Sequence, residues 1–372
     1  MMATLNTTVN LVLKSQIEAV QSVTPMKVTD PRWSRQVSVT DSHGSDIFWR
    51  CLHIILYYEK GSGEDSGWLV AGWMKESLGR ALVEQPMLAG RLRRVEEGDD
   101  RELEIVSNDS GVRLFEARIS KTLSEFLDLK EKEDAEAELV FWKDVDEQYP
   151  QFCPLFYVQV TNFECGGYSV GLSFSILLAD TLVITSFLKR WANIHNNLVS
   201  KTDIPKIPMF YVPNLKPKVC SITNPYGLSP TRNHGQSMIF KIGNKNLNQS
   251  DDMGKTVSLL CIKEAERKLG IEMASKFSLI VKEPSENIKV ENYEKEELVQ
   301  KPSSFISGIT CSSWGDLEAS EVAFHEGNKP VHVSHWISSV SGEGLAMVIP
   351  SPDEGVSGLN VIVTVPNKFS MW

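Results

Sequence analysis

The side chains best suited to proton transfer in this sequence are three histidines, His325, His332 and His335. Imidazole has a pKa near neutrality, so it can accept a proton from a hydroxyl or amine group and release it again. In the extended stretch VHVSHW, residues 331–336, strand alternation places His332 and His335 on opposite faces. The two therefore cannot bind one metal ion from a regular strand, and surface or core histidines are the favoured interpretation.

Ser169 is a second candidate, because GYSVG at residues 167–171 satisfies the G-x-S-x-G pattern of serine hydrolases. That pattern requires the serine to lie on a sharp turn between a strand and a helix. The residues around Ser169 instead predict the interior of a strand. We therefore interpret the glycines as hairpin residues. The sequence has no G-x-G-x-x-G or P-loop motif, so nucleotide-binding folds of those classes are not expected.

The elements that would position such residues are clearest in residues 155–198. Two runs rich in aromatic and β-branched residues, 155–163 and 168–176, are separated by a Gly-Gly pair, which predicts a β-hairpin. The small face of the second strand carries Ser169, Gly171, Ser173 and Ser175. From Asp180 onward, apolar residues recur at helical spacing, and the aspartate is placed to cap that helix. Residues 175–181 thus join a core strand to a buried helix, where enzymes often carry catalytic groups.

The stretch PLFYVQVTNFECGGYSVGLSFSILLADTLVITSFLKRWA resembles the central hairpin of the plant BAHD acyltransferases, which transfer an acyl group from coenzyme A to an alcohol or amine. PMLAGRLRR and LEIVSNDSGVRLFEA resemble two further segments of that family, in the same order. The family signature is HxxxDG. Its register places Asp180 on the aspartate, Thr181 on the glycine and Ile176 on the histidine, directly after Ser175.

The resemblance implies that the motif histidine removes the proton from the acceptor as it attacks the thioester. Ile176 has no titrating group, and losing a general base typically removes about a hundredfold to ten-thousandfold of the rate. The resemblance also implies that Asp180 is structural and pairs with a basic group. Helix capping gives the same interpretation from the residues alone. No catalytic residue is therefore assigned, and the motif positions are Ile176 and Asp180, flanked by Ser175 and Thr181.

The second motif of the family, DFGWG, is eroded in this sequence. In VAFHEGNKPVHVSHW, residues 322–336, aligning Gly327 with the final glycine places Ala323 on the aspartate and Glu326 on the tryptophan. This motif is structural in the family, so only Gly327 is retained as a structural site residue. A similar degradation occurs in the eceriferum subgroup, plant proteins that assist very-long-chain fatty-acid elongation for cuticular wax. Those relatives usually keep the histidine that this chain lacks.

Composition excludes several other classes of protein. A formal net charge of −10 and the absence of a basic stripe argue against nucleic acid as a partner. The six cysteines are far apart and form no C-x-x-C, so we expect reduced thiols and neither a zinc site nor a disulfide framework. The N-terminal residues show no export signal, and the longest apolar stretch contains Asp180 and is expected in the core. No transmembrane segment is predicted.

The predicted helices and strands in the rest of the sequence fall into two halves. We expect an N-terminal acyltransferase-like domain at residues 1–199, a proline-rich crossover linker at 200–233, and a shortened C-terminal domain at 234–372. The charge run 128–138 is expected to be a solvated helix or loop, and 282–301 an exposed loop. Strands are predicted at 9–13, 51–58, 237–242, 276–282, 343–350 and 359–365, and helices at 68–83 and 257–269.

By resemblance the fold is α/β, the two-domain coenzyme A-dependent acyltransferase fold of the chloramphenicol acetyltransferase type, with mixed sheets and an interdomain channel. Two functions are carried forward. One is an impaired acyltransferase-like protein that acts by binding acyl-CoA or a partner enzyme, accessory to very-long-chain acyl or wax metabolism. The other is an active O- or N-acyltransferase of plant specialised metabolism with a relocated base. Acyl-CoA is expected as substrate or ligand, with no bound cofactor and no metal. A monomer is expected, in the cytoplasm or peripheral to the endoplasmic reticulum.

Overall fold

The computed structural model describes residues 13–40, 46–61, 67–95, 102–200, 234–243, 253–270, 275–294, 309–312, 314–325, 327–338, 343–351 and 358–365. Residues 9–12 of the predicted strand at 9–13, nearly all of the predicted linker at 200–233, and Glu326 lie outside these residues. The division into two domains therefore remains a prediction.

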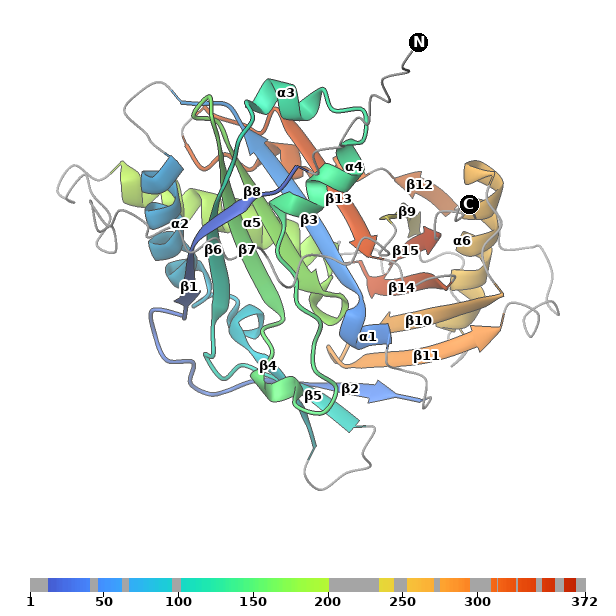
Figure 1. Cartoon of the computed structure of the whole chain (residues 1–372). Coiled ribbons are helices and arrows are strands. Elements are labelled where there is room, and N and C mark those ends of the chain that lie inside the picture. Colours follow the sequence, from blue (N-terminus) through green and yellow to red (C-terminus); the bar gives the residue numbers. More distant parts are fainter. Residues whose placement is uncertain are drawn as a thin grey trace, which may run out of the picture.

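The described part of the chain contains both strands and helices (Figure 1). The strands are β1 (Gln16–Val23), β2 (Ser34–Val39), β3 (Cys51–Tyr58), β4 (Arg91–Arg94), β5 (Glu102–Val106), β6 (Val112–Ile119), β7 (Phe156–Phe163), β8 (Tyr168–Ser175), β9 (His234–Ile242), β10 (Lys276–Lys282), β11 (Ile288–Glu294), β12 (Ile309–Ser312), β13 (His332–Ser338), β14 (Gly344–Pro350) and β15 (Leu359–Val365). The helices are α1 (Asp46–Trp49), α2 (Gly67–Ala81), α3 (Leu123–Leu127), α4 (Lys132–Glu136), α5 (Thr181–Val199) and α6 (Met253–Leu269).

Hydrogen bonds connect these strands into one continuous mixed sheet, which we divide at the short pairing of β13 with β9 into a first and a second sheet. The first has the order β1-β6-β7-β8-β3-β13, and the second has the order β9-β15-β14-β10-β11-β2-β5-β4, with β12 paired to β9. Parallel pairs such as β6 with β7 and β10 with β14 lie among antiparallel ones. A short pairing of β13 with β9 joins the two sheets. The predicted α/β fold with mixed sheets is confirmed.

The two halves of the sequence exchange strands. β13, from the second half, pairs with β3 in the first sheet. β2, β4 and β5, from the first half, extend the second sheet through the pairing of β2 with β11. Neither sheet is therefore built from one half of the chain alone.

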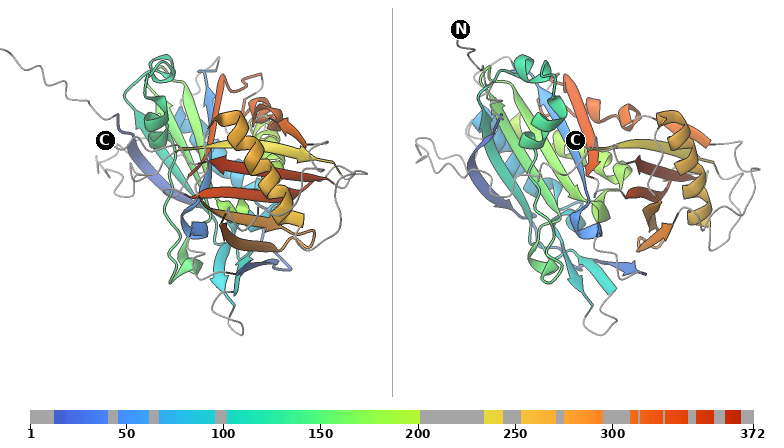
Figure 2. Two further views of the ribbon diagram at one scale, coloured as in Figure 1. Left: turned by 90° about the vertical axis from the view of Figure 1, so that its right-hand side faces the viewer. Right: turned by 45° about the vertical axis from the view of Figure 1, so that its right-hand side comes forward.

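Helices cover both faces of the first sheet. α2 and α5 pack against each other on one face, where the bulky residues of β8 lie in the main apolar core. α3 and α4 cover the opposite face (Figure 1). There the small residues of β8 are required, because a Cβ on Gly171 would lie 2.0 Å from the carbonyl oxygen of Leu139. α6 covers the second sheet over a separate apolar cluster (Figure 2).

The predicted hairpin and helix of residues 155–198 are confirmed as β7, β8 and α5. The turn between the strands uses Gly166 at φ 84°, a left-handed conformation that favours glycine. The prediction of an exposed loop at 282–301 is wrong for its central part, because residues 288–294 form β11. Ile288 and Val290 alternate with polar residues there and are buried, a period-two pattern that the surrounding charges obscured.

Candidate active site

Ile176, at the position of the motif histidine, directly follows β8. Residues 176–178 form a single 3₁₀ turn that begins where Ser175 accepts the backbone N–H of Leu177 at 3.4 Å. The N–H of Ile176 donates to the carbonyl oxygen of Arg50 at 3.0 Å, which fixes the residue beside the start of β3. The predicted strand thus ends one residue earlier, at Ser175, and Ile176 lies in the turn.

The Ile176 side chain is only 1% exposed and belongs to the main apolar core. That core also includes Ile280, Leu345 and Met347 from β10 and β14 of the second sheet. Packing of this kind is favourable for an aliphatic side chain and gives no polar environment to a reacting group. The interdomain channel expected by resemblance remains a prediction.

Asp180 combines the two structural roles that the sequence suggested for it. Its Oδ1 accepts the N–H groups of Leu182 and Val183 at 3.1 Å each, which caps α5. Its Oδ2 lies 2.9 Å from the ammonium nitrogen of Lys282 on β10, and both side chains are nearly buried. The residue therefore links the first helical turn after the motif to the second sheet. Thr181, on the motif glycine position, is buried as well.

The eroded second motif still packs against α5. The carbonyl oxygen of Ala323 accepts the side-chain N–H of Asn196 on α5 at 2.7 Å. Gly327 adopts φ 76°, a left-handed conformation that favours glycine. Phe324 between them is 2% exposed, and its ring lies 4.7 Å from that of Trp191 in an edge contact. Sequence reasoning missed Phe324, although its place in the aligned motif is the phenylalanine position.

His335 lies beside Thr181, one of the motif positions. With Thr181 and Thr185 of α5 it lines a cavity of about 20 Å³ that is otherwise lined by Ile54, Trp314, Ala319 and Val333. A cavity of this size holds about one water molecule. Burial, and to a smaller extent the charge of His332, lowers the pKa of His335 to about 4. The ring is therefore neutral at pH 7, and it is a weaker base than an ordinary imidazole.

His332 lies on the opposite face of β13, as strand parity predicts. Its Nε2 is 2.6 Å from the Lys132 ammonium nitrogen and 3.1 Å from the Ser334 hydroxyl. Ser334 donates to Glu136, which is 5% exposed. The prediction that the charge run 128–138 is solvated is therefore wrong for Glu136. A buried carboxylate there needs the hydrogen bonds that Tyr57 and Ser334 supply.

A buried thiol and imidazole also escaped the sequence analysis. The Cys51 sulfur lies 2.9 Å from Nε2 of His53, and Nδ1 of that ring lies 2.9 Å from the Ser173 hydroxyl. All three side chains are at most 1% exposed. The small residues of β8 were the available signal, since they leave room for the ring on β3, which pairs His53 with Ser173. Burial makes this group a satisfied part of the core.

His325, the remaining candidate, is half-buried and lines a second cavity, of about 40 Å³, together with His195. His195 is nearly fully buried on α5 and contacts the Ser77 hydroxyl at 3.1 Å. Burial, followed by the nearby His325, lowers the pKa of His195 to about 3. Ile176 lines neither of these two cavities nor the larger one beside α4.

The motif spacing, the mixed sheets and the capped helix are those expected of an acyltransferase-like fold. The profile of the Transferase family matches residues 15–225. This match covers more than half of the 372 residues, and the chain belongs to that family, which includes the BAHD acyltransferases. Family membership and the observed sheets together confirm the predicted fold class.

Curated relatives resemble one part of the chain. Taxadien-5-alpha-ol O-acetyltransferase of Taxus chinensis is 33% identical over 150 residues, which are 37% of this chain and 33% of the relative. Protein ECERIFERUM 26-like of Arabidopsis thaliana is 30% identical over 141 residues, 38% of this chain and 32% of the relative. Each alignment thus spans about a third of the relative's length.

Among solved structures, that of vinorine synthase is similar over 95% of both chains, with 16% sequence identity and a TM-score of 0.48. Within the described residues, no helix is both long and apolar enough to cross a membrane.

Proposed function

We propose that this chain is an acyltransferase-like protein with impaired catalysis that acts by binding acyl-CoA or a partner enzyme. The observation that carries the proposal is Ile176, an aliphatic side chain with 1% exposure at the position of the motif histidine. Isoleucine cannot accept a proton, and this side chain belongs to the main apolar core. Asp180 is retained in a purely structural role, so the scaffold of the motif persists without its base.

We further propose an accessory role in very-long-chain acyl metabolism, in the cytoplasm or at the surface of the endoplasmic reticulum. The degraded second motif and the partial similarity to the ECERIFERUM 26-like protein support this role. It is a proposal by resemblance and does not depend on the site geometry.

The second candidate is an active transferase that uses His335. Its position in a cavity shared with Thr181 favours this candidate, because it brings an imidazole beside the motif. Its lowered pKa, about 4, weighs against it, because a general base works best with a pKa near the working pH. The cavity, about 20 Å³, also has room for water but not for a substrate.

One assay separates the two candidates. The purified chain is incubated with a panel of acyl-CoA thioesters and alcohol or amine acceptors, and release of free thiol is followed. We expect acyl-CoA binding without appreciable turnover. Thiol release that Ile176→His produces or greatly raises would support the loss of the base at that position. Ile176→Leu, which changes shape without adding a base, is the matched control.

Turnover comparable to that of active relatives would refute impaired catalysis. If His335→Ala then abolished that turnover while the melting temperature was unchanged, the relocated base would be established instead.

A further inference from the structure

Arg50 is a buried arginine that uses only one side of its guanidinium group. It lies between α1 and β3, and its side chain is 1% exposed. Nη2 lies 3.3 Å from Oδ2 of Asp46, 3.4 Å from the carbonyl oxygen of Glu343 and 3.3 Å from that of Gly344. Nε and Nη1 also carry N–H groups, but both atoms are buried without an acceptor in the described part of the chain.

This orphaned side of the guanidinium group belongs to the junction of the two sheets. Arg50 directly precedes β3 of the first sheet, and Gly344 is the first residue of β14 in the second. The N–H of Ile176 donates to the Arg50 carbonyl oxygen at 3.0 Å, so the motif turn begins beside the same residue. A buried donor without an acceptor costs more free energy than an ordinary hydrogen bond contributes. An acceptor that reached these N–H groups would therefore stabilise the junction.

A second orphaned donor faces the same junction from β10. Ser278 is 2% exposed, and its hydroxyl has no partner among the described residues. In the parallel pairing of β10 with β14, Ser278 lies beside Leu345, the residue after Gly344. Strand alternation places Ser278 on the face of β10 that carries Lys282, whose ammonium group pairs with Asp180 at the start of α5. The hydroxyl therefore lies on the face of the second sheet that is turned toward the first.

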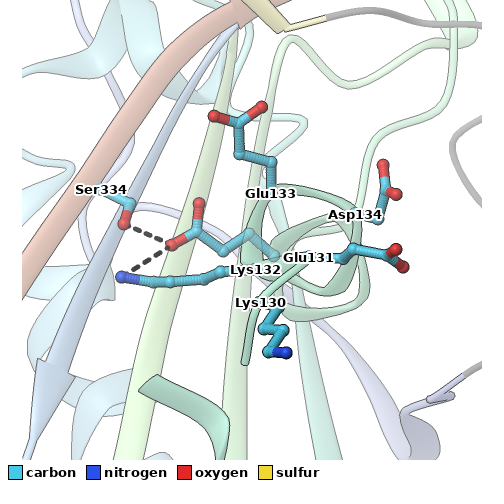
Figure 3. A pocket seen from close by; sticks show the side chains of 7 residues that line it. Lys130, Glu131, Lys132, Glu133, Asp134 and Ser334 are labelled. Carbon is cyan, nitrogen blue, oxygen red and sulfur yellow. Dashed lines mark hydrogen bonds and ion pairs between the residues drawn. The ribbon is translucent and has the colours of Figure 1, made fainter. Parts of the chain in front are cut away.

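Two other buried charged side chains show the usual situation. Arg91, 4% exposed, donates to three backbone carbonyl oxygens at 2.8–3.1 Å. In the cavity of about 490 Å³ beside α4, Lys132 and Ser334 are both directed at the carboxylate of Glu136 (Figure 3). Each of these charges has close partners, whereas Arg50 has buried N–H groups that point to a missing acceptor.

The charged groups around Arg50 can adjust to an added negative charge. The hydrogen bond with Asp46, and then burial, raises the pKa of Glu343 to about 7. Below this pH the two carboxyl groups together carry one negative charge. Lys276, which pairs with Glu294 at 3.8 Å, adds positive charge on the exposed side. The carboxyl pair can therefore take up a proton when an anion binds, which limits the repulsion between them.

We propose that Arg50 binds a small monovalent anion between the two sheets, with Nε and Nη1 as its main donors and the Ser278 hydroxyl beside them. An anion suits these groups because they can only donate to it, and a hydrogen bond between two charged groups is about twice as strong as a neutral one. A halide ion and the carboxylate of a small organic acid share this chemistry. No motif residue binds the anion, so the site does not depend on the proposed acyl-CoA function.

The first test is thermal unfolding of the full chain at pH 6 and constant ionic strength. Sodium isethionate, which has a larger anion, is replaced stepwise by sodium chloride or sodium acetate. The melting temperature should rise with the concentration of the small anion and then saturate. Arg50→Lys keeps a positive charge beside Asp46 but lacks the additional N–H groups, so the apparent affinity should fall by about tenfold or more.

Arg91→Lys is the matched control, because it makes the same change at a buried arginine that has close acceptors. It should lower the melting temperature without changing its dependence on the anion. If Arg50→Lys responded to chloride and acetate as the unmodified chain does, the response would be a general effect of salt, and the proposal would be overturned.

The second test needs no variant at position 50 and applies even if Arg50→Lys fails to fold. Crystals of the unmodified chain are grown with bromide in place of chloride, and the anomalous signal of bromine is measured. A peak within hydrogen-bond distance of Nε or Nη1 of Arg50 is expected, and the lack of one would refute a halide at this position. In solution, Ser278→Ala should weaken the anion several-fold, whereas Ser258→Ala, at a buried hydroxyl that donates to a backbone carbonyl oxygen, should not.

The third test uses pH and the identity of the anion. Affinity should be several-fold lower at pH 8 than at pH 6, because Glu343 loses its proton through pH 7 and then repels the anion. Equal affinity at both pH values would place the anion away from these carboxyl groups and overturn its assignment to Arg50. Protection at lower concentrations of acetate than of chloride identifies a carboxylate as the ligand, and the reverse order identifies a halide. Protection by neither anion would refute the site.

Discussion

Replacing Asp180 should measurably destabilise the protein, because this side chain performs two separable tasks. Oδ1 accepts two N–H groups at the start of α5, and Oδ2 pairs with Lys282 of the second sheet. Loss of an N-cap costs about 1 kcal/mol. Loss of a hydrogen bond to a charged group costs roughly 1.5–3 kcal/mol. Lys282 also contacts Glu286 at 2.9 Å, so its charge does not become wholly unpaired, and the larger cost of an isolated buried charge is not expected.

Asp180→Ala should therefore lower the free energy of unfolding by about 2.5–4 kcal/mol, the sum of both terms. Asp180→Asn retains a capping oxygen and should lose only about 1.5–3 kcal/mol, the ion-pair part. Urea titration followed by circular dichroism measures both values, and Lys282→Met completes a double-mutant cycle.

The exposed pair of Lys329 and Glu321 supplies the control. Its atoms are only 2.6 Å apart, yet Lys329→Met should change the free energy of unfolding by less than about 1 kcal/mol, because both side chains are more than half exposed. If Asp180→Ala cost no more than this control, the view of Asp180 as the link between α5 and the second sheet would be refuted.

Three further perturbations test the packing around the site. The pKa of His195 is lowered to about 3 from 6.5, so the unfolded chain binds the extra proton first. This proton uptake should lower the free energy of unfolding by about 1.4 kcal/mol per pH unit between pH 6.5 and about 3. His195→Gln should reduce the slope measured in urea titrations by this amount and leave the part that His335 contributes. Gly171→Ala should destabilise the protein by roughly 1–3 kcal/mol, because the added Cβ would overlap the carbonyl oxygen of Leu139. Gly61→Ala is the control and should be nearly neutral, because its Cβ would meet nothing within 4 Å. An unchanged melting temperature of Gly171→Ala would contradict the close approach of the two segments. Phe324→Ala should cost about 3–5 kcal/mol, and a loss below about 1 kcal/mol would show that the eroded motif no longer supports α5.

Local sequence patterns were sufficient to predict an element where burial of one face set the spacing of its apolar residues. The alternation in β8 and the apolar stripe of α5 gave the hairpin, the helix and its aspartate cap, because burial on one face leaves a period that the sequence displays. β11 was missed because charged residues fill its exposed positions, and only Ile288 and Val290 report the buried face.

The polar groups of the interior were harder to predict, since their partners lie far away in sequence. Glu136 looked like one of many charges in a run until Tyr57 and Ser334 were seen to approach it from two strands. Cys51 and His53 are two residues apart, so their contact could have been predicted from the local sequence. Their burial could not, because the segments that cover them come from other parts of the chain. Contacts between residues that are far apart in sequence leave no periodic pattern from which they could be predicted.

The acyltransferase motif has lost its histidine at Ile176 but retains its aspartate at Asp180, and the structure gives a physical reason for this difference. Asp180 stabilises the folded state through the helix cap and the ion pair with Lys282. Its loss would therefore lower the free energy of unfolding even in a protein without catalytic activity. A histidine at position 176 contributes to chemistry alone, and in this buried setting an imidazole would lose hydration without a described partner. An isoleucine there is buried in an apolar core that includes residues of both sheets. Under the proposed loss of catalysis, selection for stability alone would favour this pair of residues, an aliphatic side chain followed by a retained aspartate.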